Sequence, residues 1–184
     1  FEAAAAPGGD RDRRSRIEHA QHLKAADFDR FAQLGVIASV QPYHAVDDGR
    51  WAERRIGPER ARTTYAFRTF LDRGVRLAFG SDWPVAPMDP VLGIAAAVTR
   101  APIDGSRPSG WVPEEKLGLE DAIRAFTQGG AFAEFAEARK GVLAPGRLAD
   151  LVVLDRDPFS VEPAALKDIR VVRTVCGGAD VFRR

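Results

Sequence analysis

The chain has 184 residues, of which 45% are hydrophobic, so it can bury the core of one domain and a part of another. Its 27 Lys and Arg residues nearly balance 26 Asp and Glu residues, which argues against a nucleic-acid-binding surface. The one cysteine excludes an intrachain disulfide framework, and no apolar run approaches the roughly 18 residues of a membrane span. We therefore expect a cytoplasmic protein with no nucleic-acid or membrane partner.

The first half of the chain alternates predicted strands and helices. Residues 1–6 look like the end of a helix, and residues 7–15 predict a charged turn. Apolar or alternating runs predict strands at 16–22, 36–42 and 75–82. Apolar side chains three or four apart, bounded by Pro or Gly, predict helices at 24–35, 58–74 and 88–100, with a polar loop at 43–57.

This alternation is the signature of βαβ units, which build a parallel sheet. The nearly continuous apolar strands agree, because both faces of a parallel sheet are covered. Periodicity alone does not choose between a doubly wound sheet and a (β/α)8 barrel. Three units are too few to close a barrel, which typically needs about 250 residues.

The pattern changes toward the C-terminus. Residues 117–137 predict a helix that is interrupted at Gly129–Gly130. Short strands with tight turns follow, one at 151–154 and two around Gly177–Gly178. Cys176 lies in a predicted strand, where we expect a small buried side chain. We predict one α/β unit over residues 1–138 and a small antiparallel β unit over residues 139–184.

Three side chains with metal-binding chemistry fall near the ends of the predicted parallel strands: His19, His44 and Asp82. The carboxyl ends of strands carry the active site in parallel α/β folds, and His and Asp are ligands that Zn²⁺ uses. A metal lowers the pKa of bound water from about 15.7 toward about 7, and Asp82 can carry a proton to a leaving group. A single histidine at a strand end is more often structural, and a turn or N-cap role for Asp82 is an equal alternative, since no HxH or HExxH pair is present.

Other polar and aromatic side chains have plainer explanations. His22 is expected at the surface or behind the site. Trp51, Trp83 and Trp111 lie in predicted loops, where they either line an apolar pocket or seal the packing of the loops. Arg100 is predicted to be a solvated surface charge rather than an anchor for an acidic substrate. A nucleotide-binding role ranks low, because no glycine-rich phosphate loop is present.

Four segments together resemble the C-terminal half of amidohydrolase family 3, and most closely its YtcJ-like branch. In chain order they are SRIEHAQHL, GVIASVQPYHA, GVRLAFGSDWPVAPMDP and RKGVLAPGRLADLVVLDRDPF. The resemblance covers essentially the whole chain. It implies that the first part corresponds to strands six to eight of a (β/α)8 barrel, and that the tail is the C-terminal portion of a small β-sandwich domain.

The resemblance also implies roles for individual residues. His19 matches the metal-ligating histidine at the end of strand six, and Asp82 matches the strand-eight aspartate that contacts the metal and acts as general base and proton shuttle. His44 matches a strand-seven position that faces the pocket, so we expect it to contact the substrate or to support the ligands from behind, and we expect Trp83 to contact the substrate. The implied cofactor is a divalent metal, Zn²⁺, and the implied reaction is hydrolysis of a carbon–nitrogen bond in a small amide-like substrate.

Several ligands of the family have no counterpart in this chain: the HxH pair, the carboxylated Lys or Glu, and the strand-five His. A catalytic zinc takes about three protein ligands plus water. We therefore expect the full-length family member to be the enzyme, and this chain to be an incomplete C-terminal fragment that is inactive alone. The alternatives are a non-catalytic α/β binding or structural module and a half barrel completed by another chain. A homo-oligomer also stays open.

Overall fold

The computed structural model describes residues 12–184, so the predicted helix end at residues 1–6 and the start of the predicted turn lie outside the described residues. Within this range the strands form two sheets of three. The first sheet is parallel, in the order β1-β2-β3, with strands Arg16–Glu18, Ile37–Val40 and Leu77–Phe79. The second is antiparallel, in the order β4-β5-β6, with strands Leu151–Leu154, Val171–Cys176 and Ala179–Arg183. The predicted α/β class and parallel strands are confirmed.

Aromatic side chains of two helices build the core beside the parallel sheet. Helix α2 (Asp27–Gln33) connects β1 to β2 and buries Phe28 and Phe31. Both rings pack edge-on against Phe70 of α6 (Phe67–Asp72), with ring centroids 5.0 Å apart. Helix α6 leads directly into β3, whose three residues are all buried. The apolar faces of the two helices therefore hold the parallel strands in place.

The stretch between β2 and α6 differs from its prediction. The expected polar loop at 43–57 is wrong, because it contains helices α3 (Pro42–Asp48) and α4 (Ala52–Ile56). The expected single helix at 58–74 is also wrong, because it breaks into α5 (Pro58–Ala61) and α6. The break is at Tyr65, whose φ of 52° lies in the left-handed region and cannot continue a helix.

Helix α7 (Pro90–Thr99) begins as predicted, since the Asp89 carboxylate accepts a hydrogen bond from the Val91 amide at 2.9 Å. After the short helix η2 (Pro113–Glu115), helix α8 (Leu119–Arg124) continues through a π-helical turn, η3 (Ala125–Gly129), into α9 (Gly130–Ala133). The predicted interruption at Gly129–Gly130 is therefore a change of helical type rather than a break. Residues 134–137 lie beyond the helix.

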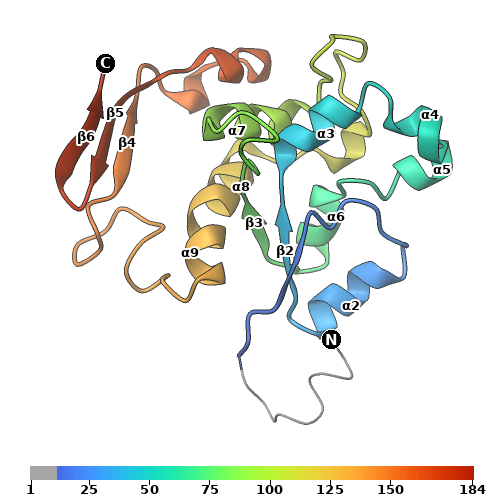
Figure 1. Ribbon diagram of the computed structural model, residues 1–184, viewed down its shortest axis with the longest axis horizontal. Coiled ribbons are helices and arrows are strands. Elements are labelled where there is room, and N and C mark those ends of the chain that lie inside the picture. The colour runs from blue at the N-terminus through green and yellow to red at the C-terminus, as the bar shows by residue number, and fades with distance from the viewer. Residues whose placement is uncertain (1–11) are drawn as a thin grey trace.

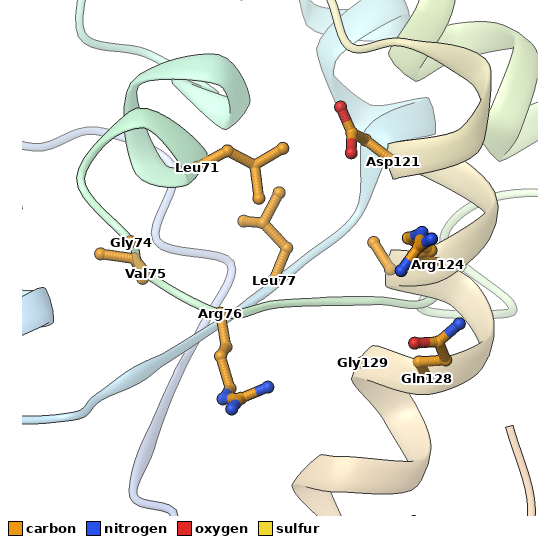
Figure 2. Close-up of a pocket in the computed structure, with 10 residues that line it drawn as sticks. Leu71, Gly74, Val75, Arg76, Leu77, Asp121, Arg124, Gln128 and Gly129 are labelled. Carbon is orange, nitrogen blue, oxygen red and sulfur yellow. The ribbon is translucent and has the colours of Figure 1, made fainter.

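Gly129 lets this long helix approach β3 closely. A Cβ atom at Gly129 would lie 2.1 Å from the Leu77 carbonyl oxygen. Both residues line a cleft of about 380 Å³. Figure 2 shows Asp121, Arg124 and Gln128 on the helix that forms one wall of this cleft. The cleft borders the residues that enter β3, at the opposite end of the strand from Asp82.

In Figure 1 the antiparallel sheet stands to one side of the part that holds β2 and β3. Helix η4 (Pro158–Ser160) and helix η5 (Pro163–Asp168) connect β4 to β5, and η5 packs on α7 through Leu166. The β5–β6 turn at Gly177–Gly178 is confirmed. The buried environment predicted for Cys176 is wrong: it ends β5 beside this turn and is exposed. Among residues 12–184, no helix has the length and hydrophobicity that crossing a bilayer requires.

Candidate metal centre

The three parallel strands deliver three potential ligands to one edge of the sheet. His19 directly follows β1, and Asp82 lies three residues beyond β3. His44 is not at a strand end but in the first turn of α3, which follows β2. Because β1, β2 and β3 are parallel neighbours, their carboxyl ends lie side by side. One ligand atom from each of the three side chains lies within 4.8 Å of the other two.

The two histidines face each other across this cluster. Their rings stack with centroids 6.0 Å apart and an interplanar angle of 14°. The Nε2 atom of His44 lies 3.9 Å from Oδ2 of Asp82, which is beyond hydrogen-bonding distance. In the described part of the chain, His44 Nε2 is buried and has no hydrogen-bond partner. A buried ring nitrogen without a partner requires an explanation, and a bound ion, a water molecule or a catalytic role are the usual ones.

The backbone at two of these residues is unusual. His19 has φ of 65° and Asp82 has φ of 58°, so both are in the left-handed region that disfavours side chains other than Gly, Asn and Asp. Such conformations cost about 1–3 kcal/mol for most side chains and less for Asp, and they cluster at functional sites. Each turns the chain sharply after its strand at the point where the ligand is presented.

Burial controls the charge of His44. Desolvation lowers the pKa of His44 below its usual value, and the carboxylate of Asp82 opposes this effect only in part. Neutral imidazole is therefore the favoured form near pH 7. This is also the form that binds metal ions, because a ring nitrogen then keeps a free lone pair.

The donor set fits a divalent metal ion. Two imidazole nitrogens and a carboxylate oxygen are ligands that Zn²⁺ takes at about 2.0–2.2 Å. In a tetrahedral site such donors are about 3.3 Å apart, and the ligand atoms of this cluster lie within 4.8 Å of one another, so these residues would be placed to hold an ion. The partnerless Nε2 of His44 supports the fit. His19 and Asp82, the two ligands expected from the sequence, lie together, and His44, the expected substrate contact, lies beside them.

The other residues singled out from the sequence are outside the cluster of His19, His44 and Asp82. His22 is outside the cluster, with Nδ1 3.0 Å from the Thr64 hydroxyl. Trp83, next to Asp82, is 65% exposed, whereas Trp111 is 1% exposed and packs within the core. The prediction that Arg100 is a solvated surface charge is wrong, because its side chain is fully buried. Its guanidinium donates to the main-chain carbonyls of Trp111 and Tyr65, which satisfies its hydrogen-bonding groups in the core.

Three polar residues behind the cluster were not singled out from the sequence: Gln21, Asp48 and Tyr65. The Asp48 carboxylate accepts hydrogen bonds from both Gln21 and Tyr65. Their spacing in the sequence gives no motif. The one available signal is that Asp48 follows His44 by four residues, which places both side chains on one face if the segment is helical.

The sequence of this chain matches the model of a known protein family over nearly its whole length. The model of the amidohydrolase family matches residues 1–182. The chain belongs to the amidohydrolase family. The resemblance seen in the four sequence segments is thereby confirmed.

Three curated proteins are similar to this chain over most of its length. It is 42% identical to the protein LONG AFTER FAR-RED 3 of Arabidopsis thaliana, over 99% of this chain and 31% of that protein. It is 34% identical to the putative amidohydrolase YtcJ of Bacillus subtilis (strain 168), over 94% of this chain and 32% of that protein. It is 29% identical to an N-substituted formamide deformylase of Arthrobacter pascens, over 92% of this chain and 31% of that protein. The chain thus spans about a third of the length of these relatives.

A solved structure has the same fold over this region. An uncharacterized metal-dependent hydrolase from Pyrococcus horikoshii OT3 superposes with a TM-score of 0.72 at 33% identity, covering 82% of this chain and 30% of that one.

Proposed function

We propose that this chain is part of a metal-dependent hydrolase that cleaves carbon–nitrogen bonds in small amide-like substrates. The observation that carries the proposal is the convergence of His19, His44 and Asp82 at the carboxyl edge of three parallel strands, with ligand atoms within 4.8 Å. Membership of the amidohydrolase family supports it, as does the similarity to a protein named as a formamide deformylase, which acts on a carbon–nitrogen bond.

In this proposal His19 and Asp82 hold a divalent metal, for which Zn²⁺ is our candidate. A bound ion would polarise the substrate carbonyl and lower the pKa of a water molecule. The carboxylate of Asp82, which is 38% exposed, accepts the proton of the attacking water and delivers it to the departing nitrogen. His44 and Trp83 orient the substrate: His44 through its unpaired Nε2, and Trp83 through the exposed ring next to Asp82.

We also propose that β1, β2 and β3 are strands six to eight of a (β/α)8 barrel, and that residues 139–184 belong to a small β-sandwich domain. The parallel order, the crossover helices and the separate antiparallel sheet support this assignment. His19 and Asp82 are two of the roughly three protein ligands of a catalytic zinc. Further ligands would then come from outside these 184 residues, and we expect the chain by itself to bind metal weakly and to be inactive.

The test uses the protein as its gene encodes it, with metal content measured by elemental analysis and turnover measured on N-substituted formamides and cyclic amides. His19→Ala should lower the metal content. Asp82→Asn should retain most of the metal and lower kcat by about 10²–10⁴, the usual contribution of general acid–base catalysis. Asp47→Asn, which removes an acidic group on α3, is the matched control and should leave both unchanged. A wild-type protein without metal or turnover would refute the proposal and favour a non-catalytic module.

His44→Ala separates two roles for this residue. If His44 contacts the substrate, the variant keeps its metal and shows a raised KM, as we expect. If it loses metal in parallel with His19→Ala, then His44 is a ligand and the expected substrate contact is wrong.

A further inference from the structure

One carboxylate behind the cluster joins the segments that carry the two histidines. Oδ2 of Asp48 accepts a hydrogen bond from Nε2 of Gln21 at 2.6 Å and another from the Tyr65 hydroxyl at 2.7 Å. The three residues come from the loop after β1, the end of α3 and the turn before α6. Asp48 is partly buried and Tyr65 is fully buried, so the hydrogen bonds are largely shielded from water. Shielding strengthens hydrogen bonds of this kind.

Each end of this connection is close in sequence to a histidine of the cluster. Gln21 follows His19 by two residues, and its side chain holds the loop that carries His19. Asp48 follows His44 by four residues within α3, so both side chains are on the same helical face. The hydrogen bond between Gln21 and Asp48 therefore ties the loop of His19 to the helix of His44. Within residues 12–184, the hydrogen bonds described include no other one between side chains of these two segments.

The third member is anchored in the core. The Tyr65 amide donates to the main-chain carbonyl of Gln21 at 2.9 Å, and Arg100 donates to the Tyr65 carbonyl at 2.8 Å. Arg100 in turn donates to the carbonyl of Trp111 at 2.7 Å. These contacts hold Tyr65 in its left-handed conformation, with φ of 52°. Burial and, next to it, hydrogen bonding to Asp48 raise the pKa of the Tyr65 hydroxyl, so it stays a donor at every physiological pH.

We propose that Asp48 is a positioning residue for the candidate metal centre. By accepting from Gln21 and from the anchored Tyr65, it fixes the position of the loop that carries the proposed ligand His19, and with it the affinity of the site for a divalent ion. This inference rests on the proposed function only in that the cluster must bind such an ion. Residues that orient metal ligands without touching the metal typically change its affinity by about 10–100-fold when they are removed.

The test measures Co²⁺ binding by the protein as its gene encodes it, through the intensity and position of the cobalt absorption bands and the dissociation constant from titration. Asp48→Ala removes both hydrogen bonds and should weaken Co²⁺ binding about tenfold and alter the bands. Asp48→Asn keeps a carbonyl oxygen that accepts from both donors, so it should restore nearly wild-type affinity. Tyr65→Phe removes one donor while keeping the ring, and it should have an intermediate effect.

Asp47→Asn is the matched control, because it removes the same charge one residue away on α3 while the network stays intact. If Asp48→Ala binds Co²⁺ like wild type, or if Asp47→Asn weakens binding equally, then Asp48 does not position the site. Should Asp48→Ala fail to fold, unchanged binding by Tyr65→Phe or weak binding by a folded Asp48→Asn overturns the inference. A wild-type protein that binds no Co²⁺ refutes the proposed function and the positioning role with it. Binding by wild type without any effect of Asp48→Ala refutes the positioning role alone.

Discussion

Replacing either of two adjacent glycines by alanine should have opposite effects on the stability of the fold. Gly129 and Gly130 both have right-handed helical backbones, with φ of −61° and −62°. A Cβ atom at Gly130 would meet nothing within 4 Å, whereas one at Gly129 would lie 2.1 Å from the Leu77 carbonyl oxygen. Carbon–oxygen contacts normally start near 3.3 Å. Gly129→Ala must therefore push the helix and β3 apart by about 1.2 Å or distort the strand.

We expect Gly129→Ala to destabilise the fold by about 1–3 kcal/mol, the usual cost of overpacking. Gly130→Ala should stabilise it by about 0.4–1 kcal/mol, because alanine reduces the conformational freedom of the unfolded chain. Since 1 kcal/mol shifts the Tm of a protein of this size by about 2–4 °C, the two variants should move Tm in opposite directions. Thermal unfolding followed by circular dichroism measures both shifts. A Gly129→Ala protein as stable as wild type would refute the close-approach argument.

Two further predictions concern other parts of the fold. The hydrogen-bonded guanidinium of Arg14 lowers the pKa of Glu137 to about 2 from 4.5, so this pair stabilises the fold above pH 4.5 and the stabilisation fades as pH falls toward 2. Glu137→Gln should flatten that acid decline in urea midpoints measured across pH, and an unchanged decline contradicts the assignment. Leu166→Ala removes a buried contact between η5 and α7, and should cost about 2–5 kcal/mol in urea unfolding. The exposed neighbour Lys167→Ala should change stability by less than about 0.5 kcal/mol, and equal effects would contradict the packing argument.

The meeting of His19 and Asp82 could be predicted from the sequence because it follows from strand order alone. Apolar strands joined by helices predict a parallel sheet, and a parallel sheet brings its carboxyl ends together. His44 lies in the same cluster although it is in a helix and not at the end of a strand. Pro42 starts a helix immediately after β2, and the polar stretch that follows gave no strong helical periodicity.

Buried polar residues were the hardest to predict. Arg100 has the chemistry of a surface residue, and its burial depends on carbonyl groups that lie 11 and 35 positions away in the chain. The left-handed turn at Tyr65 has the same origin, since Arg100 and Gln21 hold it there. Local sequence patterns do not show which distant residues will become hydrogen-bond partners. The network around Asp48 therefore became visible only with the fold.

The left-handed backbones of His19 and Asp82 have a consequence for directed evolution. Glycine at either position would relax the main chain, more at His19 than at Asp82, because Asp tolerates this region better. A gain of about 1 kcal/mol is large enough to be selected. Repeated screening of random variants for heat resistance alone would therefore tend to enrich proteins that have exchanged these side chains for glycine. Such a library would become more robust as it lost the cluster. Any thermostability campaign on this chain needs a metal-retention screen in every round.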